Sequence, residues 1–257
     1  MRCLRLYLRK GDAVSVEFEG KVALVTGGAR GIGLNIAEAL VREGASVFIC
    51  GRNPATLKTA LGHLRTLGAE TSAAGTVADV RSYKDCRKVV QQAATQFGRV
   101  DILVNNAGIG IFKPIDHLTA EEWDASIQTN LSSVFYCCRE TVPIMRQQGG
   151  GHIFNISSLL AIHGIAGGSA YCASKFGMNG LADAMMQDIR YDGIRVSTIM
   201  PGSVATDFGG GAGSNLHEPW KLSGKDIAKA VIDIYRYPGL ALVSRIEIRP
   251  CQPPRKG

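Results

Sequence analysis

Short apolar, largely β-branched runs alternate with longer stretches of helical periodicity along most of the chain. The runs predict strands at Val22–Thr26, Ser46–Cys50, Ala73–Ala78, Asp101–Asn105, Gly151–Ile156, Ile194–Met200 and Leu240–Ile248. The helical periodicity predicts helices near 31–43, 54–67, 82–97, 120–147, 172–191 and 225–236. Because strands that alternate with helices form right-handed βαβ units, we expect an α/β fold with a doubly wound parallel sheet and helices on both faces.

Two features depart from this pattern near the end of the chain. The last predicted strand carries Arg245, Glu247 and Arg249 at alternating positions, which favours an edge strand. The segment 206–222 has a glycine run, a proline and Trp220 but no regular period. It is either a surface loop or a lid that closes over a substrate, since lids need flexible hinges and an apolar contact.

Composition indicates a globular protein and excludes some partners. The chain has 257 residues, 46% hydrophobic and 20% charged, and no apolar run approaches the ~20 residues that span a bilayer. Of the net charge of +7, the first ten residues contribute +4 and those from Arg245 onward contribute +3. The body between these tails is therefore neutral, so we expect no nucleic-acid partner and no membrane association.

Cysteine usage and the chain ends bear on location and domain organisation. The 7 cysteines form no CxxC pair and no metal-ligand spacing, which favours reduced thiols in the cytoplasm and no metal site. Charges interrupt any signal-peptide core in residues 1–20, which we expect to be a poorly ordered extension. We expect one folded domain over 21–250, followed by a tail at 251–257.

A glycine-rich turn follows the first predicted strand, where KVALVT runs into GGARGIG and then an amphipathic helix. Gly27, Gly31 and Gly33 allow a tight turn and a close approach of backbone to a ligand. Amide groups and the helix dipole favour an anion at this helix N-terminus. Although the spacing is GxxxGxG rather than the common GxGxxG, its place between strand and helix indicates the pyrophosphate of a dinucleotide.

The end of the second strand indicates which dinucleotide. An acidic residue there would bind the 2′-hydroxyl of the adenosine ribose in NAD. The sequence instead has Cys50-Gly51-Arg52-Asn53, and Arg30 lies within the glycine turn. A guanidinium can pair bidentately with a phosphate. These two arginines favour NADP(H) over NAD(H).

Candidate proton-transfer chemistry lies in the stretch Tyr171-Cys172-Ala173-Ser174-Lys175. The phenol and the ammonium are four residues apart, which places them on one face of a helix. An unperturbed tyrosine titrates near pH ~10, and we expect the nearby cation to lower that pKa. Ser158, thirteen residues upstream of Tyr171, could donate to the same substrate oxygen. Together with the glycine turn, these residues predict a hydride-transfer site.

Taken together, the motifs resemble those of the short-chain dehydrogenase/reductase family over roughly residues 20–250. The match comprises TGGARGIG at 26–33, Asp79-Val80, NNAG at 105–108, Asn130, Ser158, YCASK at 171–175 and PGSVAT at 201–206. The resemblance implies a single Rossmann-type domain with about seven parallel strands, assembled into homodimers or homotetramers.

The resemblance also implies a role for each catalytic candidate. Tyr171 is expected to be the general acid in reduction and the base in oxidation. Lys175 is expected to lower its pKa and to bind the nicotinamide ribose. Ser158 is expected to orient the substrate carbonyl, and Asn130 to hold a water in a proton relay.

Further cofactor contacts are implied by the same motifs. Asp79 corresponds to an adenine contact, and Asn106 to the motif that shapes the cofactor pocket. The other implied cofactor contacts are Ile32, Val80, Ala107, Gly108, Pro201, Gly202, Val204 and Thr206, together with Tyr171 and Lys175.

Several functions are compatible with these residues. The leading hypothesis is an NADP(H)-dependent oxidoreductase that interconverts a ketone or aldehyde with an alcohol. The alternative within this chemistry is a 3-oxoacyl-thioester (acyl-carrier-protein) reductase, although Tyr136 and Gln187 stand where such enzymes typically have basic residues. A non-catalytic dinucleotide-binding regulator has no use for a tuned phenol, and a nucleotide-sugar enzyme needs a longer segment after Pro201. The sequence leaves the small-molecule substrate and the direction of reaction open.

Overall fold

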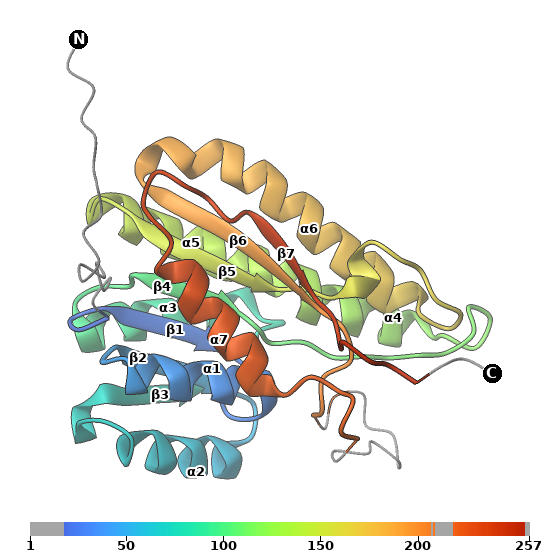
Figure 1. Ribbon diagram of the computed structural model, residues 1–257, viewed down its shortest axis with the longest axis horizontal. Coiled ribbons are helices and arrows are strands. Elements are labelled where there is room, and N and C mark those ends of the chain that lie inside the picture. The colour runs from blue at the N-terminus through green and yellow to red at the C-terminus, as the bar shows by residue number, and fades with distance from the viewer. Residues whose placement is uncertain (1–17, 207, 209–217, 255–257) are drawn as a thin grey trace.

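A computed structural model describes residues 18–206, 208 and 218–254 (Figure 1). Among these residues, seven parallel strands form one sheet in the order β3-β2-β1-β4-β5-β6-β7. The strands are β1 Val22–Thr26, β2 Ser46–Gly51, β3 Ala73–Val77, β4 Ile102–Asn105, β5 Gly151–Ile156, β6 Ile194–Pro201 and β7 Arg245–Ile248. The helices are α1 Gly31–Arg42, α2 Pro54–Arg65, α3 Tyr83–Phe97, α4 Ala120–Ile127, α5 Ser133–Gln147, α6 Ser169–Ile189 and α7 Gly224–Tyr235. The expected doubly wound, Rossmann-type sheet is confirmed.

Each face of the sheet is covered by its own layer of helices. Ala23 and Val25 of β1 belong to a buried cluster with α1, α2 and α7, while Leu24 belongs to one with α3, α5 and α6. Figure 1 shows α1 and α7 lying side by side across one face of the sheet. Both faces are buried, which is why the central strands read as continuous apolar runs rather than as alternating ones.

The strand order reverses between β1 and β4, and this reversal positions the candidate site. β1 pairs with β2 on one side and with β4 on the other, so the chain winds outward in both directions from this point. In open parallel sheets, the crevice outside the carboxyl ends of the strands at such a reversal is where ligands bind.

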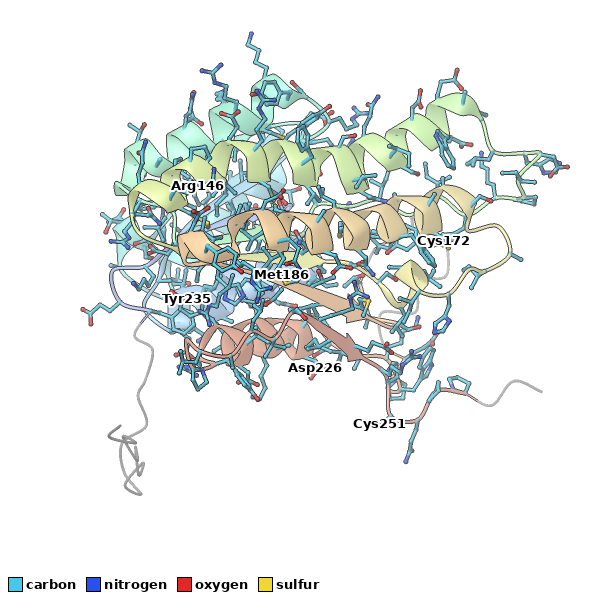
Figure 2. All side chains as sticks on the ribbon, turned by 90° about the horizontal axis from the view of Figure 1, so that it is seen from above. Arg146, Cys172, Met186, Asp226, Tyr235 and Cys251 are labelled. Atoms are coloured by element: carbon cyan, nitrogen blue, oxygen red, sulfur yellow. The ribbon has the colours of Figure 1, made fainter. Side chains whose placement is uncertain are left out.

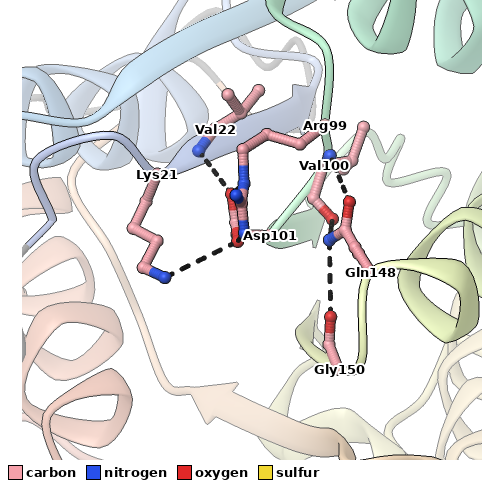
Figure 3. A network of polar contacts seen from close by, with 7 residues as sticks. All are labelled: Lys21, Val22, Arg99, Val100, Asp101, Gln148 and Gly150. Carbon is pink, nitrogen blue, oxygen red and sulfur yellow. Dashed lines mark hydrogen bonds and ion pairs between the residues drawn. The ribbon is translucent and has the colours of Figure 1, made fainter.

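At the other end of the central strands, where β1 and β4 begin, a polar network joins the two strands (Figure 3). The buried carboxylate of Asp101 accepts from the backbone N–H of Val22 at 2.9 Å and from the Arg99 guanidinium at 2.6 and 2.7 Å. The Gln148 amide bonds the backbone of Val100, donating to its carbonyl at 2.6 Å. These contacts fix the starts of β1 and β4 relative to each other, so their other ends are held in register beneath the site.

The predicted helix at 120–147 is interrupted. α4 ends at Ile127, a π-helix spans Gln128–Ser132, and α5 begins at Ser133. The wider turn is stabilised by the side chain of Asn130, which bonds backbone and side-chain groups outside the helix. A π-helical turn contains one more residue than an α-helical turn, and this small change is not visible in the spacing of apolar residues. The sequence pattern therefore predicted one continuous helix.

The last strand is shorter than expected. β7 begins at Arg245 rather than at Leu240, and Leu240 is fully exposed. β7 pairs only with β6 among the described residues, so its expected place at the edge of the sheet is confirmed.

Two other predictions fall mainly beyond the described structure. The proposed extension at 1–20 and the proposed lid at 206–222 lie largely outside the described residues, and so does the end of the tail at 251–257. Within the described ranges, no helix combines the length and apolar character that crossing a bilayer requires. The same ranges contain no group of three or more acidic, histidine or cysteine side chains placed to hold a metal ion.

Candidate active site

A cleft of about 1340 Å³ lies at the carboxyl ends of the central strands. Except for Gly33 and Asn130, every residue predicted for the site lines it: Gly27, Arg30, Gly31, Ile32, Arg52, Asp79, Val80, Asn106, Ala107, Gly108, Ser158, Tyr171, Lys175, Pro201, Gly202, Val204 and Thr206. Sites for one small ligand usually occupy about 300–1000 Å³, so this cleft has room for a dinucleotide and a substrate together.

The glycine turn between β1 and α1 forms one wall of the cleft. Gly27 has a φ of +63°, a conformation that favours glycine. A Cβ on Gly33 would lie 2.4 Å from both the Gly27 carbonyl oxygen and Asn106 Nδ2. Arg30 occupies the N-cap position of α1, but its side chain makes no hydrogen bond to the helix. The first turn of α1 therefore faces the cleft with uncapped N–H groups, which fits the pyrophosphate of a dinucleotide.

Thr26 joins this turn to the end of β4, a role that the sequence analysis did not assign. Its hydroxyl accepts from the backbone N–H groups of Asn106 at 3.0 Å and Ala107 at 3.1 Å. The Asn106 side chain in turn donates to the carbonyls of Thr26 at 2.9 Å and Gly27 at 3.2 Å. Asn106 therefore holds the glycine turn against the end of β4, and its expected role in a cofactor pocket stays a prediction. The threonine that opens the TGG motif was the available signal for this role.

The far end of the cleft carries the charges expected for the adenosine part of a cofactor. Arg30 and Arg52 both line it with exposed side chains. Asp79 is bound by the Arg81 guanidinium at 2.6 Å, and this hydrogen bond holds the pKa of the carboxyl below its usual value. Sequence reasoning missed Arg81, which forms an ion pair with the Asp79 carboxylate, and the charge of Arg52 also lowers the pKa of that carboxyl.

The reaction end brings three catalytic candidates together. Ser158 follows β5, and its hydroxyl accepts from the backbone N–H of Leu160 at 3.1 Å. Tyr171 and Lys175 lie on the first turns of α6, both buried. The competing serine at 157 donates its hydroxyl to Asn179 at 2.8 Å. Figure 2 places Cys172, the neighbour of Tyr171, at the end of the molecule opposite Tyr235 at the end of α7.

Asn130 lies behind this group in the π-helix. Its Oδ1 accepts from the N–H of Ile109 at 2.8 Å, and its Nδ2 donates to the Ile109 carbonyl at 2.9 Å and to Ser174 Oγ at 3.0 Å. The amide thus fixes the loop after β4 against α6. Its role in a water relay stays a prediction.

The protonation of Tyr171 and Lys175 differs from the expected pattern. Burial raises the pKa of Tyr171 to about 12, although the hydrogen bond with Ser158 opposes that shift. Burial also lowers the pKa of Lys175 to about 7. The Lys175 ammonium donates to the Ile156 carbonyl at 2.9 Å and lies 5.8 Å from the Tyr171 ring centroid. The expected lowering of the Tyr171 pKa by the cation is therefore not observed, because burial of the phenol sets the direction of the shift.

Comparison with known proteins decides the family. The family model described as short chain dehydrogenase matches residues 21–216. The chain belongs to the short-chain dehydrogenase family. The 3alpha-hydroxysteroid dehydrogenase of Mediterraneibacter gnavus is 36% identical over 190 residues, which cover 74% of this chain and 76% of that protein. The 3-oxoacyl-acyl-carrier-protein reductase of Chlamydia muridarum is 36% identical over 201 residues, 78% of this chain and 80% of that one.

Solved structures agree with this assignment. The crystal structure of a metagenomic short-chain oxidoreductase in complex with NADP matches with a TM-score of 0.81 at 32% identity. The match covers 92% of this chain and 100% of the other. The short-chain dehydrogenase fold and the oxidoreductase class are thereby established for the chain.

Replacing Lys175 by methionine is expected to stabilise the protein in a pH-dependent way. Because burial lowers the Lys175 pKa from 10.5 to about 7, the folded chain below pH 7 bears the full cost of a buried ammonium. Between these two values the unfolded chain holds a proton that the folded chain has released, so wild-type stability rises with pH. Lys175→Met should add on the order of 3 kcal/mol to the free energy of unfolding at about pH 6, and less at about pH 9.

Thermal or denaturant unfolding at the two pH values measures this gain. Lys84→Met, at an exposed position of α3, is the matched control and should change stability little at either pH. A gain that is the same at both pH values, or a loss at the lower one, would contradict the burial argument.

Proposed function

We propose that this protein is an NADP(H)-dependent oxidoreductase that interconverts a ketone or aldehyde with an alcohol. The observation that carries the proposal is the convergence of Ser158, Tyr171 and Lys175 on the cleft that also contains the glycine turn. A regulator that only binds the dinucleotide would gain nothing from a buried ammonium beside a buried phenol, which destabilises the fold.

The residues divide the work of carbonyl reduction between them. When bound, the nicotinamide supplies the hydride, which carries an electron pair to the carbonyl carbon. Negative charge then develops on the carbonyl oxygen, and the hydroxyls of Ser158 and Tyr171 donate to it. Tyr171 completes the step by transferring its proton to that oxygen. Its raised pKa keeps the phenol protonated at neutral pH, which suits a general acid.

A cation beside the phenol becomes important once Tyr171 has given up its proton. A tyrosinate in this buried position is stabilised by Lys175 in its charged form. The ammonium is anchored on the Ile156 carbonyl at 2.9 Å, one turn along α6 from Tyr171. In this proposal Lys175 also binds the ribose next to the nicotinamide.

NADP(H) is preferred over NAD(H) in this proposal. Arg30 and Arg52 line the adenosine end of the cleft, and no acidic residue ends β2. The related metagenomic oxidoreductase was solved in complex with NADP, which supports the same preference here. A 2′-phosphate would meet two guanidinium groups there, whereas the 2′-hydroxyl of NAD would find no carboxylate.

Small carbonyl compounds are favoured over carrier-bound acyl thioesters. One relative is named as a 3-oxoacyl-acyl-carrier-protein reductase, so this alternative has a specific basis. An acidic carrier needs cations near the mouth of the site. Tyr136 instead packs against Tyr83 with ring centroids 5.5 Å apart, and Gln187 accepts from Arg190 at 3.3 Å. Neither of these positions supplies a charge to a carrier.

The proposal includes a homodimer or homotetramer in the cytoplasm. Trp123, Phe135 and Phe176, on α4, α5 and α6, are large apolar side chains that are each more than a third exposed. Covering such side chains favours association between copies. The described cysteines are unpaired, as expected in a reducing compartment.

Arg52→Ala is expected to weaken the binding of NADPH much more than the binding of NADH. Loss of a guanidinium–phosphate contact should raise the KM for NADPH about tenfold or more and leave that for NADH within about twofold. Steady-state kinetics with both cofactors measure the difference, with Lys58→Ala on α2 as the control for a simple loss of surface charge. An equal loss with both cofactors would show that Arg52 does not read the 2′-phosphate.

Tyr171→Phe tests the reaction itself. Removing the proton donor should lower kcat for carbonyl reduction by about 10²- to 10⁴-fold, while NADPH affinity changes little. NADPH oxidation across a panel of aldehydes, ketones and acetoacetyl thioesters measures kcat, and NADPH fluorescence measures binding. Undiminished turnover in the variant would refute the assigned role. A wild type that binds NADPH but reduces no carbonyl would favour the regulator instead.

A further inference from the structure

Two aromatic rings form a wall beside Tyr171 at the reaction end of the cleft. The Phe112 ring centroid lies 5.4 Å from that of Tyr171, and the Phe208 ring centroid lies 5.7 Å from it. A Cβ on Gly110 would lie 2.7 Å from Phe208 Cε1 and 2.9 Å from Phe112 Cε2. The rings therefore converge over Gly110, which has the room for them only because it lacks a side chain.

Both rings present apolar surface to the cleft. Phe112 is 46% exposed and Phe208 is 44% exposed, and both line the cleft. Exposed phenylalanine beside a reactive phenol is surface that an apolar ligand can cover. Tyr171, in contrast, is only 7% exposed, so its own ring offers little surface for a ligand to cover.

Phe112 is held in place by its neighbour in the chain. The backbone N–H of Lys113 donates to the Gly167 carbonyl at 2.8 Å, which joins the loop after β4 to the loop before α6. The Lys113 ammonium binds Glu122 of α4 at 2.5 Å. With the next residue fixed from two sides, the position of the Phe112 ring is built into the fold.

The lining around this part of the cleft is mainly apolar. The described apolar lining includes Ile109, Leu159, Leu160, Ile165 and Trp220. Among the described lining cations other than Arg30 and Arg52, Lys221 is paired with Glu218 at 3.5 Å and Arg249 with Glu247 at 2.5 Å, while the buried Lys175 donates to the Ile156 carbonyl at 2.9 Å. A substrate carboxylate or phosphate would therefore compete with an existing ion pair and would lose water against apolar side chains.

We propose that the wall of Phe112 and Phe208 makes this enzyme selective for uncharged carbonyl compounds that carry a hydrocarbon ring beside the carbonyl, with Phe112 as the specificity-determining residue. The inference rests on the proposed carbonyl reduction. The ring of the substrate stacks on Phe112, and its carbonyl oxygen points to Ser158 and Tyr171. The reaction is unchanged: the carbonyl carbon gains the hydride, the oxygen gains the Tyr171 proton, and NADPH becomes NADP⁺.

Matched substrates test this selectivity. Benzaldehyde and acetaldehyde share the reacting group and differ in the ring, whereas acetophenone and benzoylformate share the ring and differ in charge. With NADPH, kcat/KM should be at least about tenfold higher for benzaldehyde than for acetaldehyde, and higher for acetophenone than for benzoylformate. A wild type without these preferences, or one that favours benzoylformate, would overturn the inference while leaving carbonyl reduction intact.

Phe112→Ala tests the residue. In the variant, kcat/KM for benzaldehyde should fall about tenfold, chiefly because KM rises. Its kcat/KM for acetaldehyde should stay within about twofold of the wild-type value. Ile115→Ala is the control, because Ile115 is a 70% exposed residue of the same loop that is absent from the cleft lining. Unchanged NADPH affinity and melting temperature in both variants show that the fold is kept. An equal loss of kcat/KM with both aldehydes would show that Phe112 does not determine specificity.

Binding of benzamide separates this inference from the proposed function. Benzamide keeps the ring and an unreactive carbonyl, so calorimetry in the presence of NADP⁺ reports on the wall without turnover. Binding to wild type that weakens in Phe112→Ala supports the wall even if no carbonyl is reduced, in which case only the proposed reaction fails. Absence of Phe112-dependent binding together with absence of turnover would contradict both.

Discussion

The hydrogen bonds between Thr26 and Asn106 are the interaction on which the rest of the site depends. They join the ends of β1 and β4 at the reversal of strand order, where a parallel sheet opens a crevice. Thr26 leads into the phosphate turn, and Asn106 leads into the loop that reaches Ile109 and Phe112. This short network therefore sets the distance between the two loops that line the two ends of the cleft. Gly33 has no side chain, so Asn106 and the Gly27 carbonyl can pack directly against it.

Burial of Lys175 is the second constraint. An ammonium that is 3% exposed is costly, and its pKa falls to about 7 as a result. Natural folds retain such groups where chemistry requires them. The same burial raises the pKa of Tyr171, so the pair combines a protonated phenol with a cation of variable charge. That combination suits proton donation to a carbonyl oxygen better than it suits a purely structural role.

Much of the fold and of the site could be predicted from the sequence, for reasons that particular residues illustrate. Apolar runs marked the strands because both faces of the sheet are buried, and the spacing between Ser158 and Tyr171 singled out two side chains that the fold brings to one cleft. Periodicity did not reveal the π-helix at Asn130, because the cause is a side-chain contact with a distant loop. The direction of the Tyr171 pKa shift was also mistaken, since desolvation depends on packing that spacing alone does not reveal.

Other features are visible only in three dimensions. Arg81 neutralises Asp79, and Phe112 reaches Tyr171 because Gly110 leaves space for its ring. Both are contacts between side chains whose geometry no motif records. In the proposed function, substrate recognition therefore depends on the loop after β4 that carries Phe112, while the chemistry depends on the residues of the motifs.

The most direct test of the account is to follow isotope from NADPH that carries deuterium in place of both hydrogens at C4 of the nicotinamide. If the cleft holds the dinucleotide with that carbon against the substrate beside Tyr171, the hydride passes directly between them. Mass spectrometry should then find one deuterium on the carbinol carbon of the product for each labelled hydride consumed. Deuterium that appears in water, or a product that carries none, would contradict direct hydride transfer in this cleft.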